Sequence, residues 1–180
     1  MTQSPVQIPR LPVALTYPLR FMPLAPLSAS LTAYSRMIAT SHPALFRRLG
    51  VHDHTRFVLD PTDLPVVMLL DPNLGIPRVT VVRGPGAGAA RIAGPLAALL
   101  GLVHGAFDGD ALFFSRDLVI EGETAATLAL RNAVDDAELD LSQEFLHLSG
   151  PLATPLKHVL AVLERRTGVC LSRPEELEAW

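Results

Sequence analysis

The stretch of sequence that decides the fold is DALFFSRDLVIEGETAATLALRNAVDDAEL, residues 110–139. The alternation over 117–122 predicts a short strand with Leu118 and Ile120 on one face. Gly122 then lets the backbone turn sharply into a helix predicted over 124–139. The carboxylates of Glu121 and Glu123 lie at the start of this helix, where negative charge favours the positive end of the helix dipole.

Upstream of this stretch, short runs rich in β-branched residues are separated by turn signals. Three strands are predicted, at 56–59, 66–70 and 78–82, and we expect them to pair antiparallel. The Gly-rich segment 83–88 is interpreted as a hairpin loop that leads into a short strand at 90–93. A helix is predicted from Pro95 to about His104. Its apolar face, which we expect to point inward, consists of Leu96, Leu99, Leu100 and Val103.

The two ends of the chain have different patterns. Apolar residues at helical spacing predict a helix over 27–49 with its apolar side toward the core. Pro43 must kink this helix or divide it in two. The preceding segment, 1–26, contains six prolines and is expected to be extended with short turns. A last helix is predicted over 154–166, with Thr154 as its N-cap and Pro155 as its first residue.

The stretch 110–139 also carries a family resemblance. The residues Phe113-Phe114-Ser115-Arg116-Asp117-Leu118-Val119-Ile120-Glu121-Gly122-Glu123-Thr124, followed by Arg131-Asn132, resemble the C-terminal signature of the sterol carrier protein 2 superfamily, and most closely the UbiT family. In that family a run Phe-Phe-x-Arg-x-Leu-x-Ile-Glu-Gly-Asp-Thr enters a helix that contains Lys-Asn. Glu123 here takes the place of the Asp and Arg131 that of the Lys, so both exchanges keep the charge.

This resemblance implies an α+β fold, sterol carrier protein 2-like, in which an antiparallel sheet of about five strands carries helices on one face and encloses an apolar tunnel. UbiT-like proteins are accessory factors of oxygen-independent ubiquinone biosynthesis that are thought to carry ubiquinone precursors or other isoprenoid lipids. They work beside the hydroxylase pair UbiU and UbiV, which the resemblance therefore implies as partners. No catalytic residue and no cofactor is carried over.

The composition favours a chain that lines or covers apolar space. Of the 180 residues, which suit one domain, 49% are hydrophobic and 18% are charged, against roughly a quarter charged in typical soluble chains. The net charge of −3 and the scattered basic residues argue against nucleic acid as a partner. Cys170 is the only cysteine, which excludes an intrachain disulfide and fits a reducing compartment. We therefore expect a cytoplasmic protein.

The candidate lipid-binding residues are apolar side chains in or beside the signature that could form the walls of a small-molecule cavity. They are Leu112, Phe113, Phe114, Leu118, Ile120, Ala125, Leu128 and Leu130. Any one of them alone is explained more simply as ordinary core, so the prediction belongs to the set. Each buried methylene-sized group contributes roughly 0.8 kcal/mol before the costs of binding, so about two or three isoprene units could give micromolar affinity.

Other chemistries have weaker support. His52 and His54 would share one face of an extended segment, but no third metal ligand is evident and no metal site is predicted. The Gly-rich segment lacks the Lys-Ser/Thr pair that follows in a phosphate-binding loop. Neither a Gly-x-Ser-x-Gly nor a His-Glu-x-x-His pattern occurs, so we expect that the protein is not an enzyme. The enzymatic alternative, a small hydrolase or transferase, would depend on His52, His54 and His147.

Three segments are expected: a Pro-rich apolar segment at 1–27, a lipid-binding domain at 28–145 and a helical extension at 146–180. No run approaches the ~18 uninterrupted apolar residues of a membrane span, and no secretory signal is evident. The apolar run 11–27 could rest on the inner membrane as a peripheral contact, where an isoprenoid or phospholipid would be loaded, or lie across the tunnel mouth. A different function also stays open, that of a scaffold that binds a partner protein through its apolar helices while the cavity is collapsed.

Overall fold

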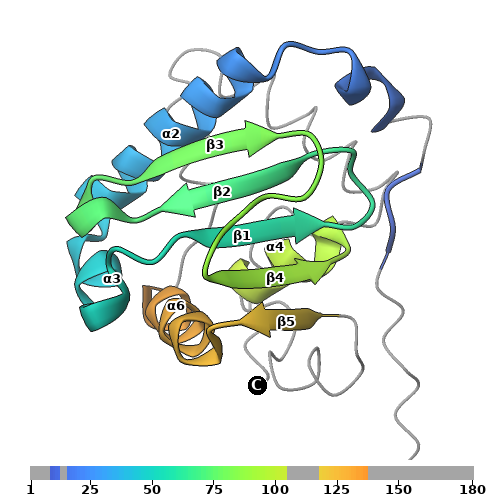
Figure 1. The fold of residues 1–180 in the computed structure, drawn as a ribbon. Helices are drawn as coiled ribbons and strands as arrows, with labels where there is room; N and C mark the ends of the chain where they lie inside the picture. Colours follow the sequence, from blue (N-terminus) through green and yellow to red (C-terminus); the bar gives the residue numbers. More distant parts are fainter. Residues whose placement is uncertain (1–8, 13–15, 105–117, 138–180) are drawn as a thin grey trace, which may run out of the picture.

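The computed structural model describes residues 9–12, 16–104 and 118–137. Figure 1 shows the fold. The helical elements before the sheet are η1 (Tyr17–Arg20), α2 (Leu24–Ser41), α3 (Pro43–Arg47) and η2 (Gly50–His52). The elements that follow are β1 (Phe57–Pro61), β2 (Val67–Asp71), η3 (Asn73–Gly75), β3 (Arg78–Val82), β4 (Ala90–Gly94), α4 (Leu96–His104), β5 (Val119–Gly122) and α6 (Thr124–Ala137).

The strands form one five-stranded sheet in the order β3-β2-β1-β4-β5. Five strands with accompanying helices confirm the expected fold class. The pairs β1–β2, β2–β3 and β4–β5 are antiparallel, as predicted. The central pair β1–β4 is parallel, with Phe57 opposite Ala90, so the sheet is mixed and the expectation of a purely antiparallel sheet is wrong at this pair. The difference arises because β4 does not pair with the strand that precedes it in the sequence.

The Gly-rich segment after β3 is a crossover and not the predicted hairpin loop. In Figure 1 it passes in front of β2 and β1 and enters β4 from the far end. A Cβ atom at Gly88 would lie 2.6 Å from Cγ2 of Val58 and 2.8 Å from the carbonyl oxygen of Arg56. A Cβ atom at Gly86 would collide with Leu69. Glycine is therefore required at position 88, where one close neighbour is a backbone carbonyl, whereas at position 86 the Leu69 side chain could move aside.

Helix α2 lies along the edge strand β3 and covers the free edge of the sheet there. The hydroxyl of Thr32 accepts a hydrogen bond from the Val79 N–H at 3.0 Å and donates one to the Val79 carbonyl at 2.9 Å. The hydroxyl of Ser28 accepts one from the Val81 N–H at 2.9 Å. Helix side chains thus satisfy backbone groups that an edge strand leaves open.

The predicted division of the helix 27–49 at Pro43 is confirmed, because α2 ends at Ser41 and α3 begins at Pro43. The first helix starts earlier than expected, at Leu24. Pro26 is tolerated there because the first turn of a helix has no intrahelical partner for its N–H groups. The remainder of the Pro-rich segment contains a short 3₁₀ turn, η1, in agreement with the predicted turns.

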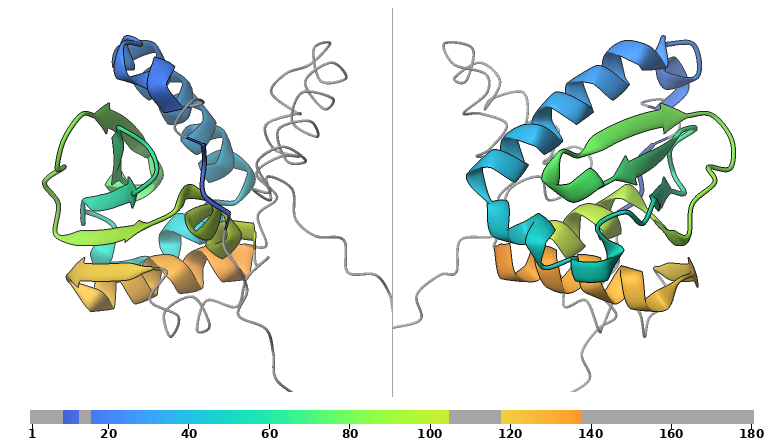
Figure 2. Two further views of the ribbon diagram at one scale, coloured as in Figure 1. Left: turned by 90° about the vertical axis from the view of Figure 1, so that its right-hand side faces the viewer. Right: turned by 60° about the vertical axis from the view of Figure 1, so that its left-hand side comes forward.

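Helices α2, α4 and α6 lie on the face of the sheet opposite the crossover, as the views in Figure 2 show. Helix α4 matches its prediction, and α6 starts at Thr124 as predicted. An ion pair between Arg48 and Asp136 joins α3 to α6. The buried core lies between this helical layer and the sheet, and includes Phe46, Leu49, Phe57 and Leu102. The predicted helix at 154–166 lies outside the described residues, and so does the part of the stretch 110–139 that precedes Leu118.

Candidate functional site

A cavity of about 280 Å³ lies between the inner face of the sheet and the helical layer. Within the described part of the chain, four strands and four helices contribute to its wall. The lining consists of Leu31, Tyr34, Ser35, Ile38, Leu45, Phe46, Leu59, Met68, Leu70, Val79, Ile92, Leu96, Leu99, Leu100, Leu102, Val103, Leu130, Arg131 and Val134. A space of this size with apolar walls suits the hydrocarbon part of a small molecule.

The sheet contributes every second residue of its strands to the cavity. Met68 and Leu70 of β2 line it, whereas the intervening Leu69 lies beneath the crossover on the other face. Leu59 of β1 is paired in register with Ile92 of β4, and both line the cavity. This alternation follows from the two-residue period of a strand, so register determines which side chains form the wall.

The helices contribute one apolar stripe each. Leu31, Tyr34 and Ile38 recur at helical spacing along α2 and line the cavity. In α4 the four residues predicted to face inward all do so, which confirms that prediction. The same residues would form a dry core if the helices packed closer, so the cavity depends on the spacing between the two layers.

The predicted lipid-binding residues are distributed over several environments. Leu130 lines the cavity. Leu118 belongs to the buried core with 4% of its surface exposed, and Ile120 is half-buried opposite Ile92 in the sheet. Ala125 and Leu128 are exposed on the outer side of α6, with Leu128 54% exposed. The remaining three, Leu112, Phe113 and Phe114, lie outside the described residues. The structure thus brings Leu130, Leu118 and Ile120 to one side of the sheet and does not bring Ala125 and Leu128 with them.

Most of the lining was absent from the predicted set, because the prediction concentrated on the signature. A signal for the missing residues was present in the sequence. The apolar stripes of α2 and α4 were predicted to face inward, but they were assigned to the core. Helical periodicity identifies a buried face and does not say whether that face touches another side chain or empty space.

Two polar clusters among the described residues, one around Arg91 and one around Arg56, lie away from the cavity. Arg91 on the outer face of the sheet donates to Asp60 and, at 2.6 Å, to Glu121. These hydrogen bonds, the one to Asp60 first, raise the pKa of the Arg91 guanidinium above its ordinary value. Arg56 donates to both carboxylate oxygens of Asp71, at 2.7 and 3.1 Å. That pairing raises the pKa of Arg56 in the same direction.

The histidines considered for a metal site have carboxylate neighbours in the structure. Nδ1 of His52 lies 3.1 Å from Oε1 of Glu123, and Nε2 of His54 lies 3.7 Å from Oδ1 of Asp53. Over residues 9–12, 16–104 and 118–137, no group of three or more His, Cys, Asp or Glu side chains is arranged to hold a metal ion. His147, the third histidine of the enzymatic alternative, lies outside the described residues.

A five-stranded mixed sheet and a helical layer with an apolar cavity between them define a small α+β domain of the cavity-forming type. The model of the SCP-2 sterol transfer family matches residues 42–135, more than half of the chain. The chain belongs to the SCP-2 sterol transfer family. This confirms the superfamily to which the signature at 110–139 was assigned.

One solved structure supports this fold. The chain is similar to a structure described as UbiJ-SCP2 ubiquinone synthesis protein, with a TM-score of 0.53 and 19% identity, over 66% of this chain and 98% of the other. It also matches the apo form of sterol carrier protein 2 from Yarrowia lipolytica, at 15% identity and a TM-score of 0.42, over 62% of this chain and 92% of the other. No curated protein sequence gave a significant match.

Proposed function

We propose that this protein is a non-enzymatic lipid-binding accessory factor that holds isoprenoid lipids, such as ubiquinone precursors, in the cavity between the sheet and the helices. The observation that carries the proposal is the apolar lining of that cavity. Membership of the SCP-2 sterol transfer family supports a lipid ligand. The link to ubiquinone is supported by the UbiT-like signature and by the similarity to a structure whose title describes a ubiquinone synthesis protein.

The size of the cavity fits part of an isoprenoid chain. An engineered protein cavity of about 150 Å³ binds benzene, and this cavity has a volume of about 280 Å³. It therefore accommodates a hydrocarbon group about twice the size of benzene before any wall moves. A longer prenyl tail would extend past the rim or separate α2 from the sheet.

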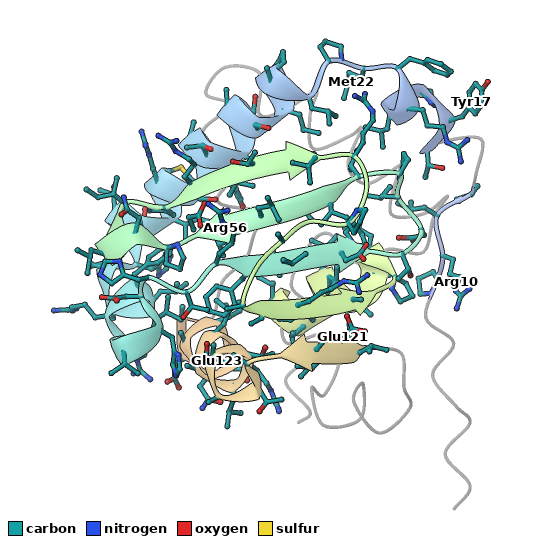
Figure 3. All side chains as sticks on the ribbon, viewed as in Figure 1. Arg10, Tyr17, Met22, Arg56, Glu121 and Glu123 are labelled. Atoms are coloured by element: carbon teal, nitrogen blue, oxygen red, sulfur yellow. The ribbon has the colours of Figure 1, made fainter. Side chains whose placement is uncertain are left out.

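Loading such a ligand requires contact with a membrane, and the N-terminal apolar patch (Tyr17, Phe21 and Met22) supports a peripheral one. These side chains are 56%, 74% and 40% exposed. The rings of Tyr17 and Phe21 pack edge to face with centroids 5.5 Å apart. Arg83 donates to the carbonyl of Met22 at 2.6 Å and so fixes the patch to the sheet. Figure 3 shows Tyr17 and Met22 beside the start of α2, at the end of the molecule far from Glu123. Interfacial segments combine apolar side chains with basic ones in this way, and Arg20 supplies the charge.

The decisive experiment is native mass spectrometry of the purified protein before and after addition of a prenylated phenol, together with analysis of an organic extract. We expect a bound isoprenoid or phospholipid, or uptake of the prenylated phenol. An empty protein that takes up no prenylated phenol would contradict the proposal. The same extract also tests which lipid class is bound.

A pair of variants on α6 assigns the bound lipid to the cavity. Val134→Trp places a large ring in the cavity, whereas Leu128→Trp places the same ring on the exposed side of the same helix. We expect Val134→Trp to lower occupancy at least several-fold and Leu128→Trp to leave it unchanged. Equal occupancy in the two variants would place the lipid elsewhere.

The proposed partners are the proteins of the same pathway, UbiU and UbiV among them. The scaffold alternative makes a different prediction for these contacts, because it requires no ligand. If partners captured by the wild-type protein bind the Val134→Trp variant equally well while that variant carries no lipid, the apolar helices act as a scaffold. Loss of partner and lipid together favours the carrier.

A further inference from the structure

A second pocket lies at the turn between β2 and β3, and it shares no lining residue with the apolar cavity. Its volume is about 290 Å³. All of its lining residues except Asp71 are exposed, so the pocket opens to solvent. We call it the arginine pocket, and its lining consists of Arg36, His54, Asp71, Asn73, Ile76 and Arg78.

The arginine pocket has an excess of positive charge. Asp71 is the one carboxylate among the described lining residues, and its two oxygens accept hydrogen bonds from Arg56 at 2.7 and 3.1 Å. Arg78 lies opposite Asp71 in the register of β2 and β3. Nevertheless, neither Arg78 nor Arg36 forms an ion pair with any carboxylate in the part of the chain that the structure describes. The ion pair of Asp71 with Arg56 is neutral as a whole, so the pocket retains two positive charges.

The turn that forms one wall of the pocket is held in place on both sides. Pro72 and Pro77, which flank it, are fully buried. The N–H of Gly75 donates to the carbonyl of Pro72 at 3.1 Å, and the N–H of Ile76 donates to the carbonyl of Asn73 at 3.0 Å. Asn73 has a φ angle of +44°, which asparagine adopts more readily than most residues. A ligand therefore finds a formed wall and loses little affinity to the ordering of the turn.

The same turn positions Arg36. Its Nε donates to the carbonyl of Pro77 at 3.3 Å. Within the described ranges, its two terminal nitrogens make no hydrogen bond, so they remain available to an acceptor in the pocket. A guanidinium presents its donors in a planar fork that fits the oxygens of a phosphate or carboxylate. Two such groups, one from helix α2 and one from strand β3, meet at one pocket.

The charge and the size of the pocket favour a phosphate ester over a carboxylate. A phosphomonoester carries nearly two negative charges at neutral pH, which match the charges of the two arginines. Asn73 and His54 contribute further hydrogen-bonding groups. Ile76, which is 59% exposed, forms an apolar part of the wall. The pocket therefore suits an organic group attached to the phosphate.

We propose that the arginine pocket is a binding site for a phosphomonoester, whose phosphate is held by Arg36 and Arg78 and whose organic group contacts Ile76. This site is separate from the lipid cavity and adds a second ligand of different chemistry. It does not depend on the proposed function, because the two sites have different residues.

The position of the pocket favours a soluble phosphate ester over a lipid head group. The pocket adjoins the start of β3, whereas the N-terminal apolar patch is bound by Arg83 just after the end of that strand. Figure 3 shows Arg56, the partner of Asp71, far from Tyr17 and Met22 of the patch. A protein that contacts a membrane through the patch therefore holds the arginine pocket away from the contact.

The test adds phenyl phosphate to the full-length protein and follows the backbone amide resonances of residues 73–76, at a pH above the second pKa of phosphate, about 6. We expect these resonances to shift with phenyl phosphate and not with phenol. Arg36→Gln and Arg78→Gln should each weaken binding about three- to tenfold, as for one charge-assisted contact at an exposed site. Arg47→Gln is the matched control, since Arg47 is exposed on α3 and does not line the pocket.

Two further variants change the affinity in opposite directions. Asp71→Asn removes the carboxylate of the pocket and releases Arg56, so it should strengthen binding about two- to threefold. Ile76→Ser should weaken binding of phenyl phosphate but leave that of inorganic phosphate unchanged, because inorganic phosphate has no ring to bury. An equal loss for both molecules would overturn the role of Ile76.

Vesicles distinguish the two sources of a phosphomonoester. Phosphatidic acid carries such a group, so phosphatidylcholine vesicles are compared with and without it. Phenyl phosphate binding without arginine-dependent binding to these vesicles supports a soluble ester. Vesicle binding that requires phosphatidic acid and both arginines, and that phenyl phosphate competes away, supports the pocket with a lipid head group as its source.

Two outcomes would overturn the proposal. One is the absence of any shift of residues 73–76 with phenyl phosphate. The other is a loss of binding in Arg47→Gln as large as that in Arg36→Gln, because binding would then reflect the charge of the whole protein. Neither outcome affects the lipid-binding proposal, which is tested by the extract and by Val134→Trp.

Discussion

At the scale of single residues, Gly122 joins β5 to α6 with a backbone that other residues rarely adopt. Its φ angle is +80°, and a Cβ atom there would collide with the carbonyl oxygen of Ala89. The same carbonyl accepts a hydrogen bond from the N–H of Glu123 at 2.8 Å. The predicted sharp turn at Gly122 is thus confirmed, and the structure adds a second reason for glycine, the close approach of β4.

We expect Gly122→Ala to destabilise the protein by more than the strain of a left-handed residue, which is about 1–2 kcal/mol. The excess arises because the carbonyl of Ala89 is backbone and cannot rotate away. Gly84→Ala is the matched control, since Gly84 has a φ angle of +88° and nothing within 4 Å of a Cβ atom. Urea unfolding of both variants measures the difference. Equal losses in the two variants would show that the contact with Ala89 has no effect.

At the scale of elements, α2 is held to the sheet by side-chain hydroxyls as well as by apolar packing. Thr32 exchanges two hydrogen bonds with the backbone of Val79, at a site that is partly buried. These bonds occupy the backbone groups of the edge strand that faces α2. The helix that forms one wall of the cavity is therefore fixed at a defined register against β3.

Thr32→Val removes the hydroxyl while it keeps the shape of the side chain. We expect a loss of about 1–3 kcal/mol in the free energy of unfolding, because the N–H and the carbonyl of Val79 lose their partner. Thr40→Val serves as the control, since the Thr40 hydroxyl is exposed and donates only to the Arg36 carbonyl within α2. Its effect should stay within about 0.5 kcal/mol. Thermal or urea unfolding would refute the expectation if the two variants lost the same stability.

At the scale of the whole molecule, exposed apolar side chains lie near both ends of α2, and they are grouped into a patch only at its start. The N-terminal apolar patch lies at the start of the helix, and Val51, which is 90% exposed, lies in η2 beyond its other end. None of the helices in the described ranges has the length and apolar character that crossing a membrane requires. The membrane contact that we propose is assigned to the N-terminal apolar patch because its side chains are exposed.

We expect the double substitution Tyr17→Ser and Phe21→Ser to weaken binding to vesicles of mixed phosphatidylglycerol and phosphatidylcholine by roughly tenfold or more, because each large apolar side chain contributes about 1.5–3 kcal/mol when fully buried. Stability should change little, since both side chains are largely exposed. Val51→Ser, an equally polar substitution at an exposed site outside the patch, is the control. Sedimentation with vesicles that shows the same loss for Val51→Ser would assign the contact to another surface.

The sequence by itself determined much of the local structure. The geometry of proline predicted the helix break at Pro43, and that of glycine predicted the turn at Gly122. The β-branched residues predicted the strands at 56–59, 66–70 and 78–82. The signature at 110–139 determined the superfamily, and the inward faces of α2 and α4 followed from helical periodicity. These features depend on neighbours in the chain, which a sequence displays directly.

Only the tertiary structure decided how these elements meet. The segment 83–88 carries the turn residues of a hairpin, but the preference of β4 for a place beside β1 made it a crossover, and no local pattern reports that preference. Leu128 and Leu130 are equally apolar and two residues apart, yet one is exposed and the other lines the cavity, because the rotation of α6 against the sheet sets which face is covered. The cavity arises from the distance between two layers, which depends on contacts between residues far apart in the chain.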